Sequence, residues 1–367
     1  MMTLRTSLIA AVALCATPAL VAAETQTKDA AKAAQPSETM VTAEEAKPWE
    51  TYKPPRRPDG TPDLQGIWTN ASVTVLERPD GVENLVLTDE EARNFGGEWL
   101  DRLESDKGVT NPDAPAPEAG QNVGGYNTFW MDPGTKVARI KGEWRSSWIV
   151  EPENGKLPYS MAGGAMAVKR GRQMSRNFDD PEVRSPGERC IVGFGSTGGP
   201  PMLNVLYNNN YQIVQTPDVV AIVVEMNHNA RLVRIGDQHR AKPLRGWLGD
   251  SVGRWEGDTL VVNTTNFHPD VSLRPAIRHR VFLSPEAKVE ERFTRIADQE
   301  IFYEFSVDDP KVYRQTWRGE MILRKTEGPI YEYACHEGNY ALPNILGGAR
   351  LEEKQAAEKA AGEKTGN

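Results

Sequence analysis

The sequence predicts an all-β fold, mainly antiparallel, that closes as a barrel or a sandwich and carries one or two helices and long loops. Strand-like segments follow one another from residue 203 onward and are separated by short turns. Ile301, Tyr303, Phe305 and Val307 alternate with a less apolar set, as in a sheet with one buried face. Crossover helices are almost absent, and strands joined without crossovers pair in antiparallel fashion.

Local signals predict the individual elements. Proline-containing turns lead into Gly66–Trp68, which we expect to be the first strand. Thr88 and Glu91 are spaced as a capping box, which predicts the start of a helix. Three large apolar residues follow at helical spacing: Phe95, Trp99 and Leu103. Further strands are expected at 145–150, 211–215, 219–226, 230–235, 259–267, 289–296, 300–307 and 312–323.

The two ends of the chain differ from its centre. Residues 1–23 combine a basic start, a short apolar run and small residues, as in a secretory signal peptide. Residues 24–57 have almost no large aliphatic side chains, so we expect a disordered tether. A single β-barrel-like domain is expected over 58–350, followed by a charged tail over 351–367. The expected location is periplasmic or secreted, in a bacterium.

Composition limits the partners. The net charge of −8 argues against nucleic acid and against anionic membrane surfaces. After Glu24 no run approaches the roughly 18 apolar residues of a membrane-spanning helix, so we expect no transmembrane segment. A small-molecule substrate or ligand is the remaining partner class, and the oligomeric state stays open.

Two cysteines remain once the signal peptide is removed, Cys190 and Cys335. In an oxidising compartment two cysteines far apart in sequence are typical of a disulfide. The alternative is a pair of buried free thiols. Cys335 lies in the dense polar stretch 331–344, so a disulfide would tie that stretch to the body of the fold.

A glycine-rich segment, Gly193 to Gly198, has the spacing Gly-X-Gly-X-X-Gly. In a dinucleotide-binding fold this spacing opens a helix. Here Gly199-Pro200-Pro201 follows, and two prolines at that place are incompatible with the first turn of a crossover helix. We therefore expect no nucleotide site. For the protein as a whole we expect acid/base side chains to act without an organic cofactor.

A long loop over 106–125 is rich in Pro, Gly and Asn and ends in Tyr126, Asn127 and Trp130. Aromatic and amide side chains after such a loop would suit the lid of a small-molecule pocket. Packing of the aromatic residues against the body of the protein is the equally weighted alternative.

Acid/base chemistry would rest on Glu225, His228 and His336. Glu225 ends an apolar strand, so its carboxyl is expected to be partly desolvated or paired with a cation such as Arg231. His336 follows Cys335, and we expect Glu225 or Asp250 to orient its ring. No compact metal-ligand spacing is present, so no metal is expected, although dispersed histidines remain an alternative.

Substrate contacts are expected from aromatic, amide and basic side chains near these groups. They suit stacking on, and hydrogen bonding to, a sugar or phenolic ring. The predicted binding residues are Tyr126, Asn127, Trp130, Tyr207, Asn209, Tyr211 and Arg231.

Four segments carry a resemblance to a known family: 207–218, 247–251, 254–262 and 331–340. They resemble an uncharacterised family of secreted bacterial β-rich proteins with a calycin- or lipocalin-like barrel. Gly66-Ile67-Trp68 is also similar to the entry strand of lipocalin-type barrels, although a plain core tryptophan explains it as well. The resemblance implies export and a β fold, and it assigns no catalytic residue.

These observations favour an exported acid/base enzyme, a lyase, isomerase or hydrolase, acting on a sugar or phenolic compound. The alternative is a non-catalytic, lipocalin-like protein that binds a small ligand. A purely structural role, in which the polar groups lock the barrel, is the third possibility.

Overall fold

The computed structural model describes residues 49–97, 100–101, 131–276 and 278–365, all within the larger of two units of the chain, Thr42–Asn367. The expected signal peptide, most of the expected tether and the expected lid over 106–125 lie outside the described residues. So do Tyr126, Asn127 and Trp130.

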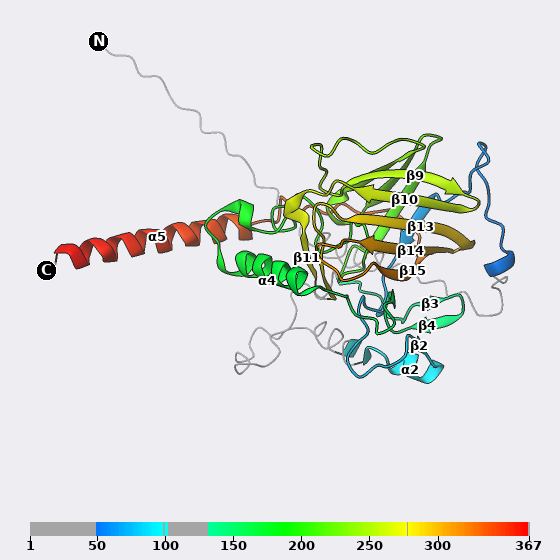
Figure 1. Ribbon diagram of the computed structural model, residues 1–367, viewed down its shortest axis with the longest axis horizontal. Helices are drawn as coiled ribbons and strands as arrows, with labels where there is room; N and C mark the ends of the chain where they lie inside the picture. Colours follow the sequence, from blue (N-terminus) through cyan, green and yellow to red (C-terminus); the bar gives the residue numbers. More distant parts are fainter. Residues whose placement is uncertain (1–48, 98–99, 102–130, 277, 366–367) are drawn as a thin grey trace, which may run out of the picture. The chain divides into compact units, whose positions relative to one another are not determined.

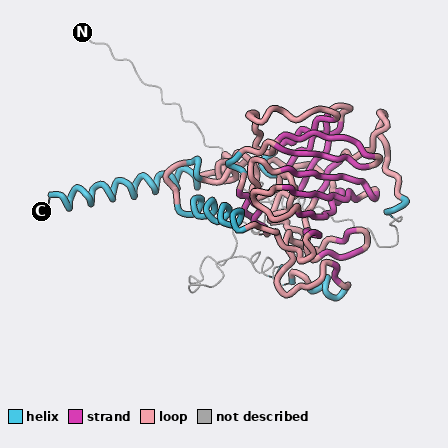
Figure 2. The backbone as a smooth tube through the Cα atoms, in the orientation of Figure 1, coloured by secondary structure: helices cyan, strands magenta, loops and turns pink. Residues whose placement is uncertain are grey.

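Nine strands in the described part of the chain form a closed barrel in the order β1-β6-β7-β8-β9-β10-β13-β14-β15, and β15 pairs back with β1 (Figures 1 and 2). Their bounds are Gly66–Thr69 (β1), Asn210–Gln215 (β6), Val219–Val224 (β7), Ala230–Ile235 (β8), Asp250–Glu256 (β9), Thr259–Thr265 (β10), Lys288–Ala297 (β13), Glu300–Asp308 (β14) and Trp317–Lys325 (β15). Neighbours are antiparallel except β8 and β9, which are parallel. The structure confirms the mainly antiparallel all-β class and decides for a barrel over a sandwich.

Alternating burial explains why these segments form a barrel wall. Along β14, Tyr303 and Phe305 are buried, whereas the intervening Glu304 is partly exposed. Phe302 is buried although it belongs to the alternate set. The ammonium of Lys141 lies 3.8 Å from the centre of its ring and covers it.

Side chains fill the inside of the barrel. Phe293 and Tyr303 have ring centres 4.9 Å apart, and Phe305 lies between Tyr303 and Trp317. Fully buried aromatic rings of this size fill the lumen of a small barrel with a packed core.

Smaller elements surround the barrel. β5 (Ile149–Glu151) pairs with β15; β2 (Val86–Leu87), β4 (Glu143–Arg145) and β3 (Arg139–Ile140) form a small sheet; β11 (Leu273–Ala276) and β12 (His279–Phe282) form a hairpin. The described α-helices are α2 (Asp89–Asn94), α4 (Met161–Arg176) and α5 (Ala341–Thr365), with four short 3₁₀ turns at Trp49–Thr51, Pro181–Val183, Met226–His228 and Pro269–Val271. No described helix has the length and apolar character needed to cross a membrane.

Two local expectations need correction, and one helix was not expected. The capping box of Thr88 and Glu91 is present, but α2 ends at Asn94 because Phe95 is extended. Trp99 and Leu103, expected on the same helix, lie outside the described residues. The strand expected at 145–150 is interrupted: β4 ends at Arg145 and β5 starts at Ile149. Helix α4 was not expected at all.

The disulfide between Cys190 and Cys335 is confirmed, with Cα atoms 5.7 Å apart. The side-chain amide of Asn339 reinforces the link by donating to the carbonyl oxygen of Glu188 at 2.7 Å. Segment 331–340 is thereby attached to the loop around residues 185–195, beside the mouth of the barrel.

Candidate functional site

Glu225 is the buried acid/base group of the predicted set. It directly follows β7 and adopts a helical backbone conformation before the turn Met226–His228. Its side chain accepts a hydrogen bond from the Asn210 amide at 2.8 Å and one from the backbone N–H of Tyr331 at 3.5 Å. Burial raises the pKa of the Glu225 carboxyl, against the opposing effect of these neutral donors. Glu225 is therefore closer to a protonated state than an ordinary glutamate.

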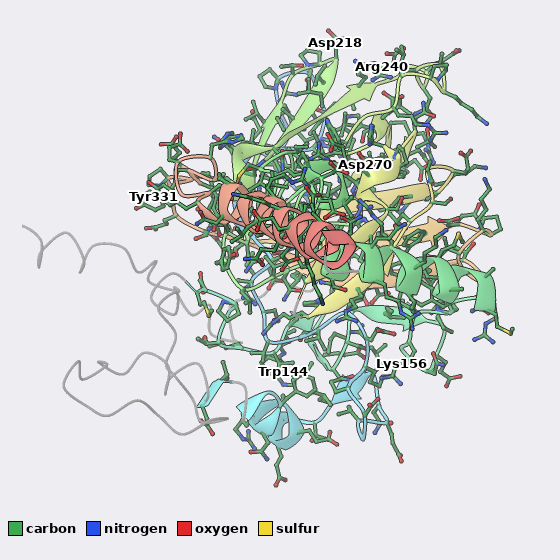
Figure 3. All side chains as sticks on the ribbon, turned by 90° about the vertical axis from the view of Figure 1, so that its left-hand side faces the viewer. Trp144, Lys156, Asp218, Arg240, Asp270 and Tyr331 are labelled. Atoms are coloured by element: carbon green, nitrogen blue, oxygen red, sulfur yellow. A yellow bond between two sulfur atoms is a disulfide. The ribbon has the colours of Figure 1, made fainter. Side chains whose placement is uncertain are left out.

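Two tyrosines lie on the segments that hold Glu225. Tyr207 precedes β6, and Tyr333 lies two residues after Tyr331; their rings are stacked with centres 6.4 Å apart. Burial, with Tyr207 adding to it, raises the pKa of Tyr333, so its phenol stays protonated. The side chain of Tyr331 itself projects outward (Figure 3). The Asn208 side chain also hydrogen-bonds to the Glu225 carboxyl. We call Glu225, Asn208, Asn210, Tyr207 and Tyr333 the rim cluster.

The histidines are placed differently from the expectation. His228 and His336 are both exposed, and neither imidazole makes a hydrogen bond or ion pair with a residue that the structure describes. The expected pairing of His336 with Glu225 or Asp250 is wrong. Asp250 instead accepts hydrogen bonds from the Arg234 side chain and from the backbone N–H of Arg240.

Arg231 is not the cation that pairs with Glu225. It lies inside the barrel and forms two hydrogen bonds, of 3.0 and 2.6 Å, with the carboxylate of Glu291. Tyr303 donates its hydroxyl to the same carboxylate at 2.7 Å and accepts from the backbone N–H of Met202. This network occupies the lumen and anchors residue 202.

Two further predicted binding residues hold the backbone rather than face a pocket. The amide of Asn209 bridges the backbone of Val205 and the carbonyl oxygen of Asp132. Tyr211 is fully buried and donates its hydroxyl to the carbonyl oxygen of Thr197 at 3.0 Å. Of the described residues in the predicted binding set, Tyr207 alone lies in the rim cluster.

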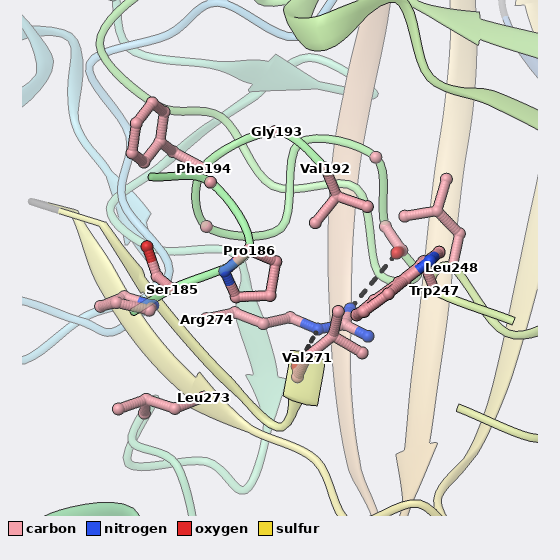
Figure 4. A pocket seen from close by; sticks show the side chains of 15 residues that line it. Ser185, Pro186, Val192, Gly193, Phe194, Trp247, Leu248, Val271, Leu273 and Arg274 are labelled. Carbon is pink, nitrogen blue, oxygen red and sulfur yellow. Dashed lines mark hydrogen bonds between the residues drawn. The ribbon is translucent and has the colours of Figure 1, made fainter. Parts of the chain in front are cut away.

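A small pocket that the sequence did not reveal lies beside the glycine-rich segment (Figure 4). Its volume is about 40 Å³, and Arg274 from β11 contributes the charged group of its wall. Trp247, Leu248 and Val271 are among its apolar neighbours. We call it the Arg274 pocket. The glycine-rich spacing could have marked this place, but Arg274 itself follows no motif.

Neither a metal cluster nor a relative identifies the site. Among the described residues, no three His, Cys, Asp or Glu side chains are grouped so that they could hold a metal ion. Comparison with protein-family models, with curated proteins and with solved structures gives no match.

Proposed function

We propose that the protein is an exported acid/base enzyme that uses the rim cluster to act on a small sugar or phenolic compound. The observation that carries this proposal is the buried carboxyl of Glu225, which is held by neutral donors and has a raised pKa. A carboxyl whose pKa lies closer to neutrality can both release and take up a proton during one reaction. Elimination, isomerisation and hydrolysis all use such a group.

The residues around Glu225 fit this class of substrate. The stacked rings of Tyr207 and Tyr333 offer aromatic surface, and the amides of Asn208 and Asn210 offer hydrogen bonds beside the carboxyl. Such a mixture is typical of sites that bind sugar or phenolic rings. No organic cofactor is part of the proposal.

A lipocalin-like binder is supported less well. Lipocalins hold a ligand inside the barrel, whereas Phe293, Tyr303, Phe305 and the Arg231–Glu291 pair occupy this lumen. A ligand would have to bind at the barrel end, where the rim cluster lies.

Export is part of the proposal and is supported by the disulfide. A bond between Cys190 and Cys335 persists in oxidising compartments and is rare in the bacterial cytosol. Fractionation of the producing bacterium, followed by N-terminal sequencing, tests this part. Recovery of an uncleaved chain in the cytosol would refute it.

The enzyme proposal is tested with Glu225→Gln on purified mature protein screened against sugars and phenolic compounds. We expect activity to fall roughly 10²–10⁴-fold, the usual loss for a general acid or base, while the folded state persists. Glu304→Gln is the matched control. Burial also raises the pKa of Glu304, but that side chain lies on the outer face of β14. Full activity in Glu225→Gln would remove Glu225 from the mechanism.

A further inference from the structure

We propose that the Arg274 pocket is a second binding site, separate from the rim cluster, and that it takes the carboxylate of a short-chain organic acid. The site requires a buried cation that the protein does not neutralise, a cavity beside it, and walls that suit a short hydrocarbon chain. Each of these is present.

The guanidinium of Arg274 is buried and incompletely satisfied. Its Nε donates to the carbonyl oxygen of Val271 at 3.1 Å, and its Nη1 donates to those of Gly199 and Pro200 at 3.3 and 2.8 Å. Its Nη2 is buried and has no hydrogen-bond partner in the described chain. These hydrogen bonds fix the Arg274 side chain in place, and its Nη2 donor remains without an acceptor.

No described carboxylate forms an ion pair with Arg274, whose residue exposure is only 5%. The nearby Arg231 is already paired with Glu291, so that carboxylate forms no ion pair with Arg274. Burial, together with Arg231, lowers the pKa of Arg274 to about 10, so the guanidinium remains charged at neutral pH. A buried cation without a counter-ion is unfavourable, and an anion beside it would relieve that cost.

The glycine-rich segment forms one side of the pocket with its backbone. Gly193, Gly195 and Gly198 line the pocket, and their N–H groups make no hydrogen bond to a described residue. Side chains could not be accommodated easily at these positions. A Cβ atom at Gly198, for example, would lie 3.0 Å from Leu248. Close backbone approach of this kind is common where a loop binds an anion.

The walls and the volume select the class of anion. Trp247, Leu248 and Val271 are the apolar residues of this wall (Figure 4). Trp247 and Leu248 are only half-buried, so this side of the pocket adjoins solvent. A cavity of about 40 Å³ is large enough for a group as small as a carboxylate. A carboxylate beside Arg274 would neutralise the guanidinium, and its hydrocarbon chain would pack against the apolar side chain of Trp247.

The pocket is structurally distinct from the rim cluster. Met226 separates them: its sulfur accepts a hydrogen bond from the N–H of Phe194, which lines the pocket, whereas Glu225 does not line it. The two proposals can therefore fail independently.

Calorimetric titration and thermal shift with acetate and butyrate test the inference, with butyramide as the uncharged match. We expect wild-type protein to bind butyrate more tightly than acetate, and not to respond to butyramide. Equal binding of butyramide, or absence of butyrate binding at millimolar concentration, would overturn the proposal. Inorganic phosphate binding as tightly as butyrate would overturn the assignment to organic acids.

Variants locate the site. Arg274→Met should weaken butyrate binding tenfold or more because it removes the charge. Since this change could also disturb the Gly199–Pro200 carbonyls, Leu248→Trp provides a second test that fills the pocket from its half-buried side. Leu244→Trp is the matched control, on the same segment but exposed and outside the pocket. Glu225→Gln should leave butyrate binding intact. Unchanged binding in folded Leu248→Trp would place the acid elsewhere.

Discussion

At the residue scale, the environments of two buried carboxyls set their different roles. Glu291 is fully buried and held by Arg231 and Tyr303, so its charge is compensated inside the barrel. Glu225 has amide and backbone donors in place of a cation. Burial without a cationic partner raises the pKa of Glu225, and for this reason the proposed mechanism assigns proton transfer to Glu225.

Asp250 links the start of β9 to the preceding loop and should set part of the acid stability. Burial opposes its ionisation, but hydrogen bonds from Arg234, the N–H of Arg240 and His239 outweigh burial and lower its pKa to about 2. The unfolded chain takes up a proton near pH 4, before the folded protein does. This contribution is therefore fully present above pH 4 and is lost as the pH falls toward 2.

We predict that Asp250→Asn lowers the free energy of unfolding at pH 7 by about 2 kcal/mol, and that the variant loses less stability than wild type between pH 4 and pH 2. Urea unfolding across this pH range measures both effects. Asp237→Asn is the control, because Asp237 contacts the same Arg234 from an exposed position. An equal acid dependence in Asp250→Asn and wild type would contradict the assignment.

At the element scale, helix α4 depends on a close contact with the backbone. Its N-terminus is capped by Ser160, whose hydroxyl accepts from the N–H of Gly163 at 2.9 Å. A Cβ atom at Gly163 would lie 2.0 Å from the carbonyl oxygen of Val312, whereas one at Gly164 would meet nothing within 4 Å. A side chain therefore cannot be accommodated at Gly163, whereas there is room for one at Gly164.

We predict that Gly163→Ala destabilises the protein by about 2 kcal/mol or more, because α4 must move away from Val312. Gly164→Ala should instead stabilise it by about 0.5–1 kcal/mol, since alanine loses less backbone entropy in a helix. Thermal unfolding of the two variants side by side provides the measurement. Destabilisation of similar size in both would mean that the Val312 contact is unimportant.

Sequence reasoning located most strands, because each strand is specified by its own alternation and turns. β6, β8 and β14 lie within one or two residues of their predicted bounds. The sequence did not indicate helix α4 because its first turns contain Gly163 and Gly164, and glycine disfavours helix formation. Only the structure shows that the close approach to Val312 requires a glycine at position 163.

The site was predicted less completely, because its chemistry depends on pairings between distant residues. The partner of Arg231 is Glu291, which lies sixty positions along the chain and belongs to another strand. From the sequence alone, Glu225 is the expected partner of Arg231, because the two residues are close along the chain. The Arg274 pocket is likewise assembled from four separate segments and carries no local motif.

At the scale of the whole molecule, the disulfide closes a long loop, because Cys190 and Cys335 are 145 positions apart in the sequence. In the chain-entropy account, a crosslink over such a distance stabilises the folded state by up to about 5 kcal/mol. It also holds segment 331–340, which supplies Tyr331 N–H to Glu225 and Tyr333 to the rim cluster.

We predict that replacing Cys190 and Cys335 together by alanine lowers the free energy of unfolding by about 2–5 kcal/mol. The rim cluster should lose order before the barrel does. Hydrogen exchange should therefore rise first over 331–340, while the amides of β13 and β14 remain protected. Mass spectrometry of non-reduced peptides from wild type verifies the bond. Equal exchange throughout the double variant and wild type would refute this role for the crosslink.

The number of strands in the barrel explains the single parallel pair, β8 and β9. A closed ring whose neighbours all run in opposite directions must contain an even number of strands. This barrel has nine, so at one place two neighbours are forced to run the same way. Parallel neighbours cannot be joined by a tight hairpin, so residues 236–249 form a long connection from the end of β8 to the start of β9. This connection places Trp247 and Leu248 in the wall of the Arg274 pocket. One wall of the pocket therefore exists because the barrel has an odd number of strands. A fully antiparallel barrel of eight or ten strands would not require this long connection.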